Sequence, residues 1–505
     1  MMGAIYEGAK NVIVWLGLDT DNTPSVKSII TFGTNLDIHW DPAKTPSYNK
    51  EDKYSVLKIT LWLMNQWYTR IWTLQEAALA RSLVYRCGSF TIQEREMDGF
   101  INSFIRHFFG EQCCNMRNLD MKHGIAGLDM EIHSWAVRMR NMVKLKNTKG
   151  PSNFLEIASK FRHRLATNPR DKVFGVLGLT TDLPKTIVDY TPSVVETFSK
   201  VVFEHITRTG TLDILSHTLP KPNDRTDNTP TERSEIFPSW VPDWSDSRKK
   251  ENWRLPGLSE RQSFTHIFHA CSLGSTPCPR RISPDQLELK GIFCDKIVEL
   301  GAPMHFNILG CDLEVFKNWR QMTNVDKDPE RPYIAGTTTL DAYFRTLCMD
   351  IDPSKFSSDT PTTDTTAIKA DITTRGLHDK WWWNVLLFLE YPGESKGPGA
   401  KMLQTPLFQK YSSHFAIVAS GRKMFLTEKG YLGLASDEAH KGDEIWILDG
   451  GRLPLVLRRH DTQAPGTVSS KYTFIGDGYV QGIMGGEFAE KALEDGVMPT
   501  SVILV

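Results

Sequence analysis

The sequence predicts an α/β N-terminal part built on a partial parallel sheet, then a helical region, then a C-terminal small β-barrel or sandwich. Three observations predict this order. Two strand-like runs near the N-terminus are separated by helix-like segments, as in a doubly wound α/β unit. Apolar residues then recur at helical spacing from about 92 to 216. Beyond residue 396, short apolar runs alternate with Gly-containing turns, which is typical of small β domains.

The N-terminal α/β part is expected over residues 1–91. Residues 11–16 (NVIVWL) form a nearly continuous apolar run, which is typical of a parallel strand buried on both faces. The run at 82–88 (SLVYRCG) predicts a second strand. Between the two strands, the sequence predicts a short helix near 24–36 and helices at 55–68 and 70–80.

A helical region is expected over residues 92–217. Its clearest helix is 191–210, because Thr191 is a favourable N-cap and Pro192 a favourable first helical residue. Gly210 follows the last periodic residue, where helices commonly end. The apolar face of this helix carries Val194, Val195, Phe198, Val201, Val202 and His205.

A linker followed by an extended segment is expected over residues 218–245. Residues 220–235 are rich in Pro, Thr and charged residues, which is typical of a loop. Residues 236–245 (IFPSWVPDWS) alternate Trp with Pro, so we expect an extended chain packed onto a surface.

A mixed α/β middle region is expected over residues 246–395. Residues 287–301 read as strands, and the run WWWNVLLFL at 381–389 predicts a buried helix. Its three Trp point in different directions, so at least one is exposed or lies in an interface. The polar stretches at 324–339 and 357–376 are expected to be mobile loops.

The C-terminal β-rich domain is expected over residues 396–505. Short strands with Gly at their turns are indicated by KMFLTEKGYLGLAS, GDEIWILDGGRLPLVLRR and KYTFIGDGYVQGIMGGE. LDGG at 448–451 is the strongest hairpin signal among them.

Composition excludes several classes of protein. A chain of 505 residues is long enough for about three or four domains, and its 40% hydrophobic content is that of a globular protein. Lys plus Arg (59) nearly balance Asp plus Glu (60), so no global field predicts nucleic-acid binding. The 8 cysteines are too few for a disulfide scaffold. The most apolar run is too short to span a membrane, and we expect a cytoplasmic protein with reduced thiols.

The first residues, MMGAIYEGAK, resemble the second half of an amphipathic helix that leads directly into the strand at 11–16. No N-cap precedes them, and a helix needs several turns to be stable. We therefore expect the chain to be truncated at its N-terminus.

Common catalytic and metal motifs are absent. The grouping His266, His269, Cys271 and Cys278 fits no usual zinc spacing, so the sequence predicts no metal. The adjacent cysteines at 113–114 are interpreted as incidental. Neither a Gly-rich phosphate loop nor a GxSxG nucleophile motif occurs.

The stretch RIWTLQEAALA at 70–80 carries the candidate site. On a helix, Trp72 and Glu76 share a face, and Gln75 lies on the adjoining stripe. Such an arrangement can stack a flat ligand and bind a ribose. In the structural alternative, Trp72 belongs to the core and Arg70 or Arg81 pairs with Glu76.

Several segments resemble the fungal heterokaryon incompatibility (HET) domain proteins. These are AIYEGAKNVIVWLG (4–17), RIWTLQEAALA (70–80), NPRDKVFGVLGL (168–179) and PSWVPDWS (238–245), and the C-terminal strands resemble the tail of the same proteins. Members also carry upstream a strand ending near Tyr-x-Trp-Gly and a Trp-Ile-Asp…Cys-Ile-Asn-Gln segment, and this chain begins after both. The resemblance implies a role in non-self recognition that triggers programmed cell death.

HET domains are in turn similar to TIR domains, whose sheet is flavodoxin-like. Some TIR domains hydrolyse NAD with a glutamate four residues after a Trp, and Trp72 and Glu76 have that spacing. The resemblance implies a catalytic Glu76, with Trp72, Arg70 and Gln75 binding the ligand. NAD would then be a substrate, and no cofactor is expected.

Two other functions compete with this hypothesis. The chain could be a non-enzymatic protein-interaction scaffold, with an unidentified protein partner or self-association, or an inactive truncated homologue. NAD depletion on expression separates the first two hypotheses, and folding of the chain tests the third.

Overall fold

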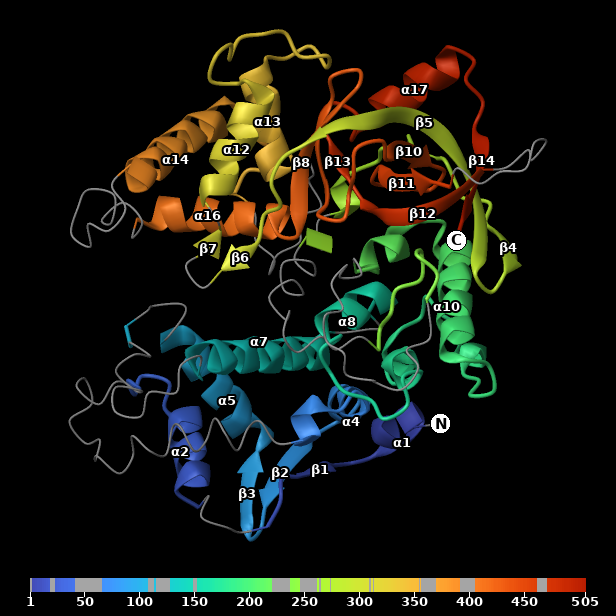
Figure 1. Cartoon of the computed structure of the whole chain (residues 1–505). Helices are drawn as coiled ribbons and strands as arrows, with labels where there is room; N and C mark the ends of the chain where they lie inside the picture. The colour runs from blue at the N-terminus through green and yellow to red at the C-terminus, as the bar shows by residue number, and fades with distance from the viewer. Residues whose placement is uncertain are drawn as a thin grey trace, which may run out of the picture. The chain divides into compact units, whose positions relative to one another are not determined.

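In the computed structural model the chain forms two compact units, one of residues 1–188 and 244–247 and the other of residues 189–243 and 248–505 (Figure 1). The structure describes residues 2–18, 23–40, 66–107, 113–114, 128–148, 152–219, 237–245, 261–262, 265–272, 274–307, 310–311, 313–353, 355, 369–390, 405–460 and 470–505.

The first unit contains a three-stranded sheet in the order β1-β2-β3. Strands β1 (Val12–Trp15) and β2 (Leu83–Cys87) are parallel, as the sequence predicts. Strand β3 (Phe90–Gln93) was not expected, and it pairs antiparallel with β2 across a two-residue turn. Gly88 at this turn has a φ of 53°, a conformation that glycine adopts without strain.

The expectation that β1 is buried on both faces is wrong. Val12 and Val14 are buried, whereas Ile13 is 60% exposed and Trp15 is 50% exposed. The reason is that β1 lies at the edge of a small sheet, so only one of its faces packs against the core. An apolar run therefore does not by itself show that both faces are covered.

Helices occupy most of the other described residues of the first unit. The helix expected near 24–36 is confirmed as α2 (Thr23–Thr34), and the one expected at 70–80 is the shorter α4 (Thr73–Ala78). Most of the helix expected at 55–68 lies outside the described residues. The other helical elements are α1 (Met2–Gly8), η1 (Gln66–Thr69), α5 (Glu94–Ile105), α7 (Leu128–Asn147), α8 (Phe154–Lys160), α9 (Asp171–Phe174), η3 (Leu177–Leu179) and η4 (Lys185–Ile187).

Helices α2 and α5 cross in close contact at a pair of glycines. A Cβ atom on Gly33 would lie 2.0 Å from the backbone oxygen of Glu96, and one on Gly99 would lie 2.1 Å from the backbone oxygen of Gly33. Trp40 fills the space beside the crossing: its ring stacks on Phe32 at 4.1 Å between centroids. Its indole Nε1 donates a hydrogen bond of 3.1 Å to the Ser103 hydroxyl. This crossing therefore fixes the end of α5 against the loop that follows α2.

The second unit begins with α10 (Val194–Thr209). Its N-cap is Ser193 rather than the expected Thr191, because the Ser193 side chain accepts a hydrogen bond from the Glu196 amide. The Thr191 amide instead donates to the Asp189 carboxylate. The predicted end is confirmed: Gly210 is left-handed, with a φ of 67°.

The sheet of the second unit has nine strands in a mixed arrangement. Its main path is β10-β11-β12-β14-β5-β8-β9-β13, and β10 also pairs with β5. Five of these strands, β5, β10, β11, β12 and β14, pair in a ring, and β8, β9 and β13 extend from β5 as an additional arm, so the sheet as a whole is not a closed barrel (Figure 1). The strands are β4 (Arg280–Ser283), β5 (Gln286–Leu300), β8 (Arg422–Thr427), β9 (Leu432–Ser436), β10 (Glu444–Leu448), β11 (Leu455–Arg459), β12 (Ser470–Asp477), β13 (Tyr479–Val480) and β14 (Thr500–Leu504).

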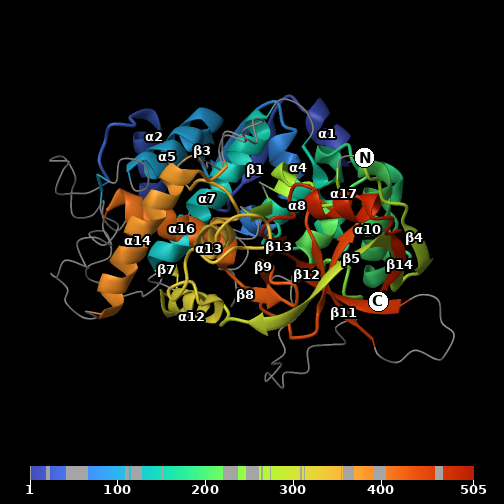
Figure 2. The ribbon, with the colours of Figure 1, turned by 90° about the horizontal axis from the view of Figure 1, so that it is seen from above.

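Helices of the second unit gather on the side of the sheet where β8 lies (Figures 1 and 2). Trp381 lies fully buried in their core, 4.6 Å from the ring of Phe415, whereas Trp383 is 62% exposed, as the WWW run predicts. The helices are α12 (Leu313–Thr323), α13 (Thr339–Cys348), α14 (Ile372–Glu390) and α16 (Pro406–Ala419). The smaller elements are η5 (Asp213–His217), η6 (Thr265–Ile267), β6 (Phe306–Asn307), β7 (Gly310–Cys311) and α17 (Glu487–Glu494).

The polar stretch at 324–339 is packed onto the sheet. The Tyr333 hydroxyl donates to the Gln481 carbonyl and accepts from the Leu432 amide, each at 2.9 Å. Most of the other predicted loop, 357–376, lies outside the described residues. No helix in the described part of the chain is both long and apolar enough to span a membrane.

Candidate functional site

The residues of the candidate site lie on α4 and the turn before it. The Thr73 hydroxyl stabilises this turn by donating to the backbone oxygens of Trp67, at 2.9 Å, and Arg70, at 2.7 Å. Arg70 itself is exposed, and its backbone forms a bridge with Leu165. Trp72 is half-buried and occupies the N-cap position without a side-chain cap.

Glu76 is held by two side chains from other elements. Its carboxylate accepts a hydrogen bond of 2.9 Å from the indole Nε1 of Trp67. Tyr6 on α1 is also hydrogen-bonded to Glu76, and burial together with the Glu76 charge raises the pKa of the Tyr6 hydroxyl. The indole that contacts the acid is therefore Trp67 and not Trp72. Trp67 lies at the end of the segment predicted as one long helix, where no helical spacing relates it to Glu76.

Gln75 holds two segments of the first unit together. It is buried, and its side-chain amide donates to the backbone oxygen of Gly175 at 2.8 Å. A Cβ atom on Gly178 would lie 2.6 Å from the Gln75 side-chain oxygen. Gln75 thus fixes the segment after α9 against α4.

Arg164 lies buried behind the site. It donates to the Thr73 hydroxyl at 2.6 Å and to the Arg70 carbonyl at 3.1 Å. Burial lowers the pKa of Arg164 to about 9, and the charge on Arg138 adds to this, whereas Tyr68 and Glu76 oppose it. The field of Glu76 therefore reaches this guanidinium, although no ion pair joins Glu76 to Arg70 or Arg81 among the described residues.

The predicted residues thus come together only in part. Glu76 contacts Trp67 rather than the predicted Trp72, which lies at the N-cap of α4. Gln75 points to a different segment, and Arg70 contributes backbone atoms. The carboxylate has a hydrogen-bonded position in the first turn of α4. Such a carboxylate can accept hydrogen bonds from the hydroxyl groups of a sugar. Alternatively, its hydrogen bonds to Trp67 and Tyr6 only hold η1 and α1 against α4.

A separate cavity of about 50 Å³ lies in the second unit. Arg422 forms a buried ion pair with Asp477, and burial lowers the pKa of the neighbouring Arg261 to about 9. Three buried polar groups at this cavity have no hydrogen-bond partner within the described structure: Arg422 Nη1, Arg261 Nε and the Ser420 hydroxyl. The two guanidinium groups can only donate hydrogen bonds, which suits a small anion or ordered water.

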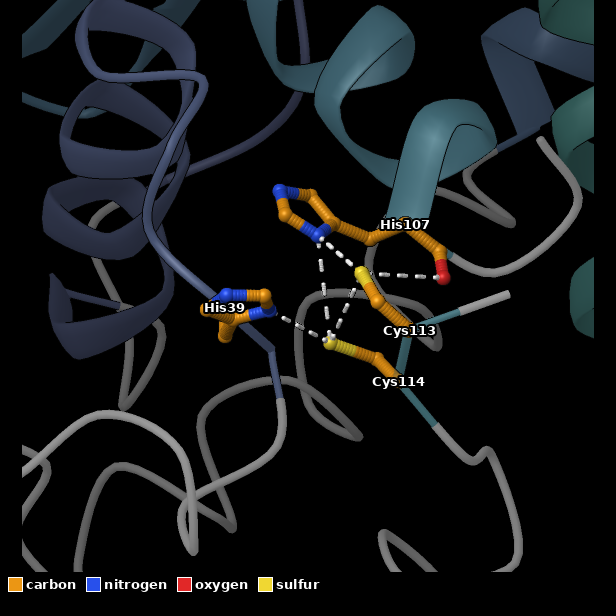
Figure 3. A group of neighbouring side chains, drawn as sticks. All are labelled: His39, His107, Cys113 and Cys114. Carbon is orange, nitrogen blue, oxygen red and sulfur yellow. Dashed lines mark hydrogen bonds between the residues drawn. The ribbon is translucent and has the colours of Figure 1, made fainter. Parts of the chain in front are cut away.

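Four potential metal ligands converge at the end of α5 in the first unit (Figure 3). His39 follows α2, His107 lies two residues beyond the end of α5, and Cys113 and Cys114 come shortly after. Their ligand atoms all lie within 4.8 Å of one another. His107 and Cys114 are buried, and the other two side chains are half-buried.

Sequence spacing gives no indication of this cluster. Cys114 and His39 are 75 positions apart, and Cys113 follows His107 by 6. The grouping that the sequence suggested, His266, His269, Cys271 and Cys278, does not converge in this way within the described chain. The one local signal is a histidine shortly before two adjacent cysteines.

Comparisons with known proteins agree with the resemblance seen in the sequence. Residues 1–76 match the family described as "Heterokaryon incompatibility protein (HET)", and residues 402–497 match the "Het-6 beta-barrel domain". The chain is also similar to "Heterokaryon incompatibility protein 6, OR allele" of Neurospora crassa. The two are 23% identical over an alignment that covers 97% of this chain and 78% of the relative. No solved structure matches the chain with statistical significance.

Proposed function

We propose that this chain, a relative of the fungal heterokaryon incompatibility proteins, acts in non-self recognition and triggers cell death. The observation that carries the proposal is the order and extent of the similarity. The HET match lies at one end, the Het-6 β-barrel match lies near the other, and the alignment to the Neurospora protein spans both. Similarity confined to one domain would support only a shared fold.

The finer proposal is that Glu76 takes part in cleavage of NAD. Its carboxylate would accept the ribose hydroxyls and stabilise the positive charge that develops on the sugar as nicotinamide leaves. Three observations support this role: the half-buried position of Glu76, its fixed orientation against Trp67, and the Trp72 side chain one helical turn away. Water would then attack the sugar carbon, giving ADP-ribose and nicotinamide.

A second candidate is a non-enzymatic interaction protein. It is favoured by the contacts of Glu76 with Trp67 and Tyr6, because these already use the carboxylate to join three elements of the first unit. In this case the acid stabilises the fold, and the cell-death signal passes through a protein partner or self-association.

Nicotinamide release by the purified full chain separates the two candidates. We expect Glu76→Gln to lower turnover by at least about a hundredfold if the carboxylate stabilises the transition state. The matched control is Glu156→Gln, which changes an exposed glutamate of α8 in the same unit. Equal turnover in the wild type and Glu76→Gln would remove Glu76 from the mechanism.

The same variants expressed in a fungal host test the broader function. We expect the wild type and Glu156→Gln to cause cell death. Death caused equally by Glu76→Gln, without loss of NAD, would favour the interaction protein. Absence of death with all three folded proteins would contradict the non-self recognition role.

A further inference from the structure

We propose that His39, His107, Cys113 and Cys114 bind one zinc ion that stabilises the first unit. This inference is independent of the proposed function. Two imidazole nitrogens and two thiolates form the ligand set that Zn²⁺ prefers at structural sites. Because all four positions of a tetrahedron are then filled by protein atoms, the site has no open position for a substrate.

The distances between the ligand atoms fit a tetrahedral ion. With zinc–sulfur bonds of about 2.3 Å and zinc–nitrogen bonds of about 2.0 Å, neighbouring ligands lie roughly 3.3 to 3.8 Å apart. The two sulfur atoms are 4.0 Å apart, and Cys114 Sγ lies 3.6 Å from His39 Nδ1 and 3.9 Å from His107 Nδ1. Cys113 Sγ lies closer to His107 Nδ1, at 2.9 Å. Small side-chain rotations would place all four at bonding distance from one centre.

A hydrogen bond outside the cluster orients His107 for metal binding. Its Nε2 lies 2.9 Å from the carbonyl oxygen of Leu36. Because a carbonyl oxygen only accepts, Nε2 carries the proton in this contact, and the lone pair of a neutral ring is left on Nδ1. Nδ1 is the atom that faces both sulfur atoms (Figure 3).

The rigid crossing of α2 and α5 positions the two histidines. His39 lies next to Trp40, which is fully buried against Phe100 and Phe104 of α5. His107 continues α5 beyond these rings. A zinc ion would therefore join the loop after α2, the end of α5 and the two cysteines.

The 2.9 Å contact between His107 and Cys113 also fits another chemistry. A cysteine activated by a neighbouring histidine is a nucleophile. However, a nucleophile needs one thiol, whereas here a second thiol and a second imidazole reach the same point. The complete four-ligand set favours the metal.

Zinc content of the purified full chain tests the proposal. We expect one zinc ion per chain in the wild type, and roughly tenfold or more less in Cys113→Ser/Cys114→Ser. The matched control, Cys271→Ser/Cys278→Ser, removes the two cysteines of the grouping that does not converge, and it should keep its zinc. Equal zinc contents in the two double variants, or a wild type that stays free of zinc after incubation with it, would overturn the proposal.

Two measurements on the wild type keep the test valid if the double variant fails to fold. Cobalt(II) added to the metal-free protein should give the intense visible bands and sulfur-to-metal charge transfer of tetrahedral thiolate coordination. A weak, six-coordinate cobalt spectrum would contradict the site. Zinc should also protect Cys113 and Cys114 from iodoacetamide, as seen by mass spectrometry, and rapid alkylation of Cys113 in the presence of zinc would overturn the assignment.

Discussion

Two polar clusters of the first unit differ in how their groups are satisfied. Around Glu76, the carboxylate meets an indole N–H and a tyrosine, so acceptor and donors match within the protein. Around His107, two imidazole rings and two thiols contact one another directly, and each of the four side chains offers an atom that can bind a cation. The first arrangement is complete without a ligand, whereas the second gains most from a cation at its centre. A ligand site is therefore indicated better by several potential ligand atoms that converge on one point than by an unusual residue on a helix.

The largest effect should come from removing the metal. A chelator should lower the free energy of unfolding of the first unit by about 4 kcal/mol when zinc is present at a thousandfold excess over its Kd. Hydrogen exchange should show this as faster exchange in α2 and α5, with β5 of the second unit unchanged. If the exchange rates of α2 and α5 were the same with and without chelator, the His107 cluster would not need a metal. The contrast between the His107 and Glu76 clusters would then be wrong.

The next largest effect is expected from a substitution at the glycine pair where α2 and α5 cross. Gly33→Ala places a methyl group against backbone atoms of Glu96, so α2 and α5 must separate, at a cost of about 3 kcal/mol. Zinc binding should weaken as well, because His39 and His107 move apart. Gly8→Ala is the control, since a Cβ there meets nothing within 4 Å. Thermal unfolding and zinc content measure both effects, and an unchanged zinc affinity in Gly33→Ala would show that the crossing does not position the ligands.

A smaller loss of stability is expected from a substitution in the Glu76 cluster. Trp67→Phe removes the indole donor of Glu76 while keeping an aromatic ring against Tyr68 and Tyr85. We expect a loss of about 1 kcal/mol, because Glu76 is partly solvated, and no change in zinc content. Trp383→Phe on the exposed face of α14 should cost almost nothing. If Trp67→Phe were as stable as the wild type, the carboxylate would not depend on this bond, and a role toward a ligand would gain support.

The smallest effect concerns Asp98 on α5, the helix that leads to His107. Burial, together with the charge on Glu94, raises the pKa of Asp98 to about 6, and Lys146 opposes the shift. Because the folded pKa lies above that of the unfolded chain, the protonated form is favoured by folding. Its contribution to stability is full below about pH 4 and is lost as the pH rises through about 6.

Asp98→Asn should therefore raise the melting temperature slightly above pH 6 and leave it unchanged near pH 4. Asp37→Asn is a suitable control, because Asp37 forms an exposed ion pair with Arg106. A stabilisation by Asp98→Asn that does not vary with pH would show that the carboxyl group is not titrating in this range.

Local patterns predicted the parts of the fold that depend on neighbouring residues. The parallel β1–β2 pair, the left-handed Gly210 and the exposed Trp of the WWW run all follow from spacing or backbone preference. The N-cap of α10 was misplaced because Thr191 and Ser193 are both suitable capping residues. The structure pairs Thr191 with the nearby Asp189 and leaves Ser193 to cap the helix.

Contacts between distant or interrupted segments could not be predicted from local sequence patterns. The Trp67–Glu76 bond crosses a break in the helix, so helical spacing pointed to Trp72 instead. The His39–Cys114 contact joins segments 75 positions apart without a recognisable motif. Likewise, β5 lies in the middle of the chain but pairs with strands that follow much later.

The pairing of β5 has a consequence for synthesis in the cell. Apart from β4, its partners β8, β10 and β14 follow it in the chain, and β14 begins only at Thr500. At typical translation rates, β5 emerges from the ribosome on the order of ten seconds or more before β14. During this interval a long strand with free edges is open to incorrect pairing. We therefore expect the nascent chain to depend on chaperones, and slow translation after β5 to lower its yield.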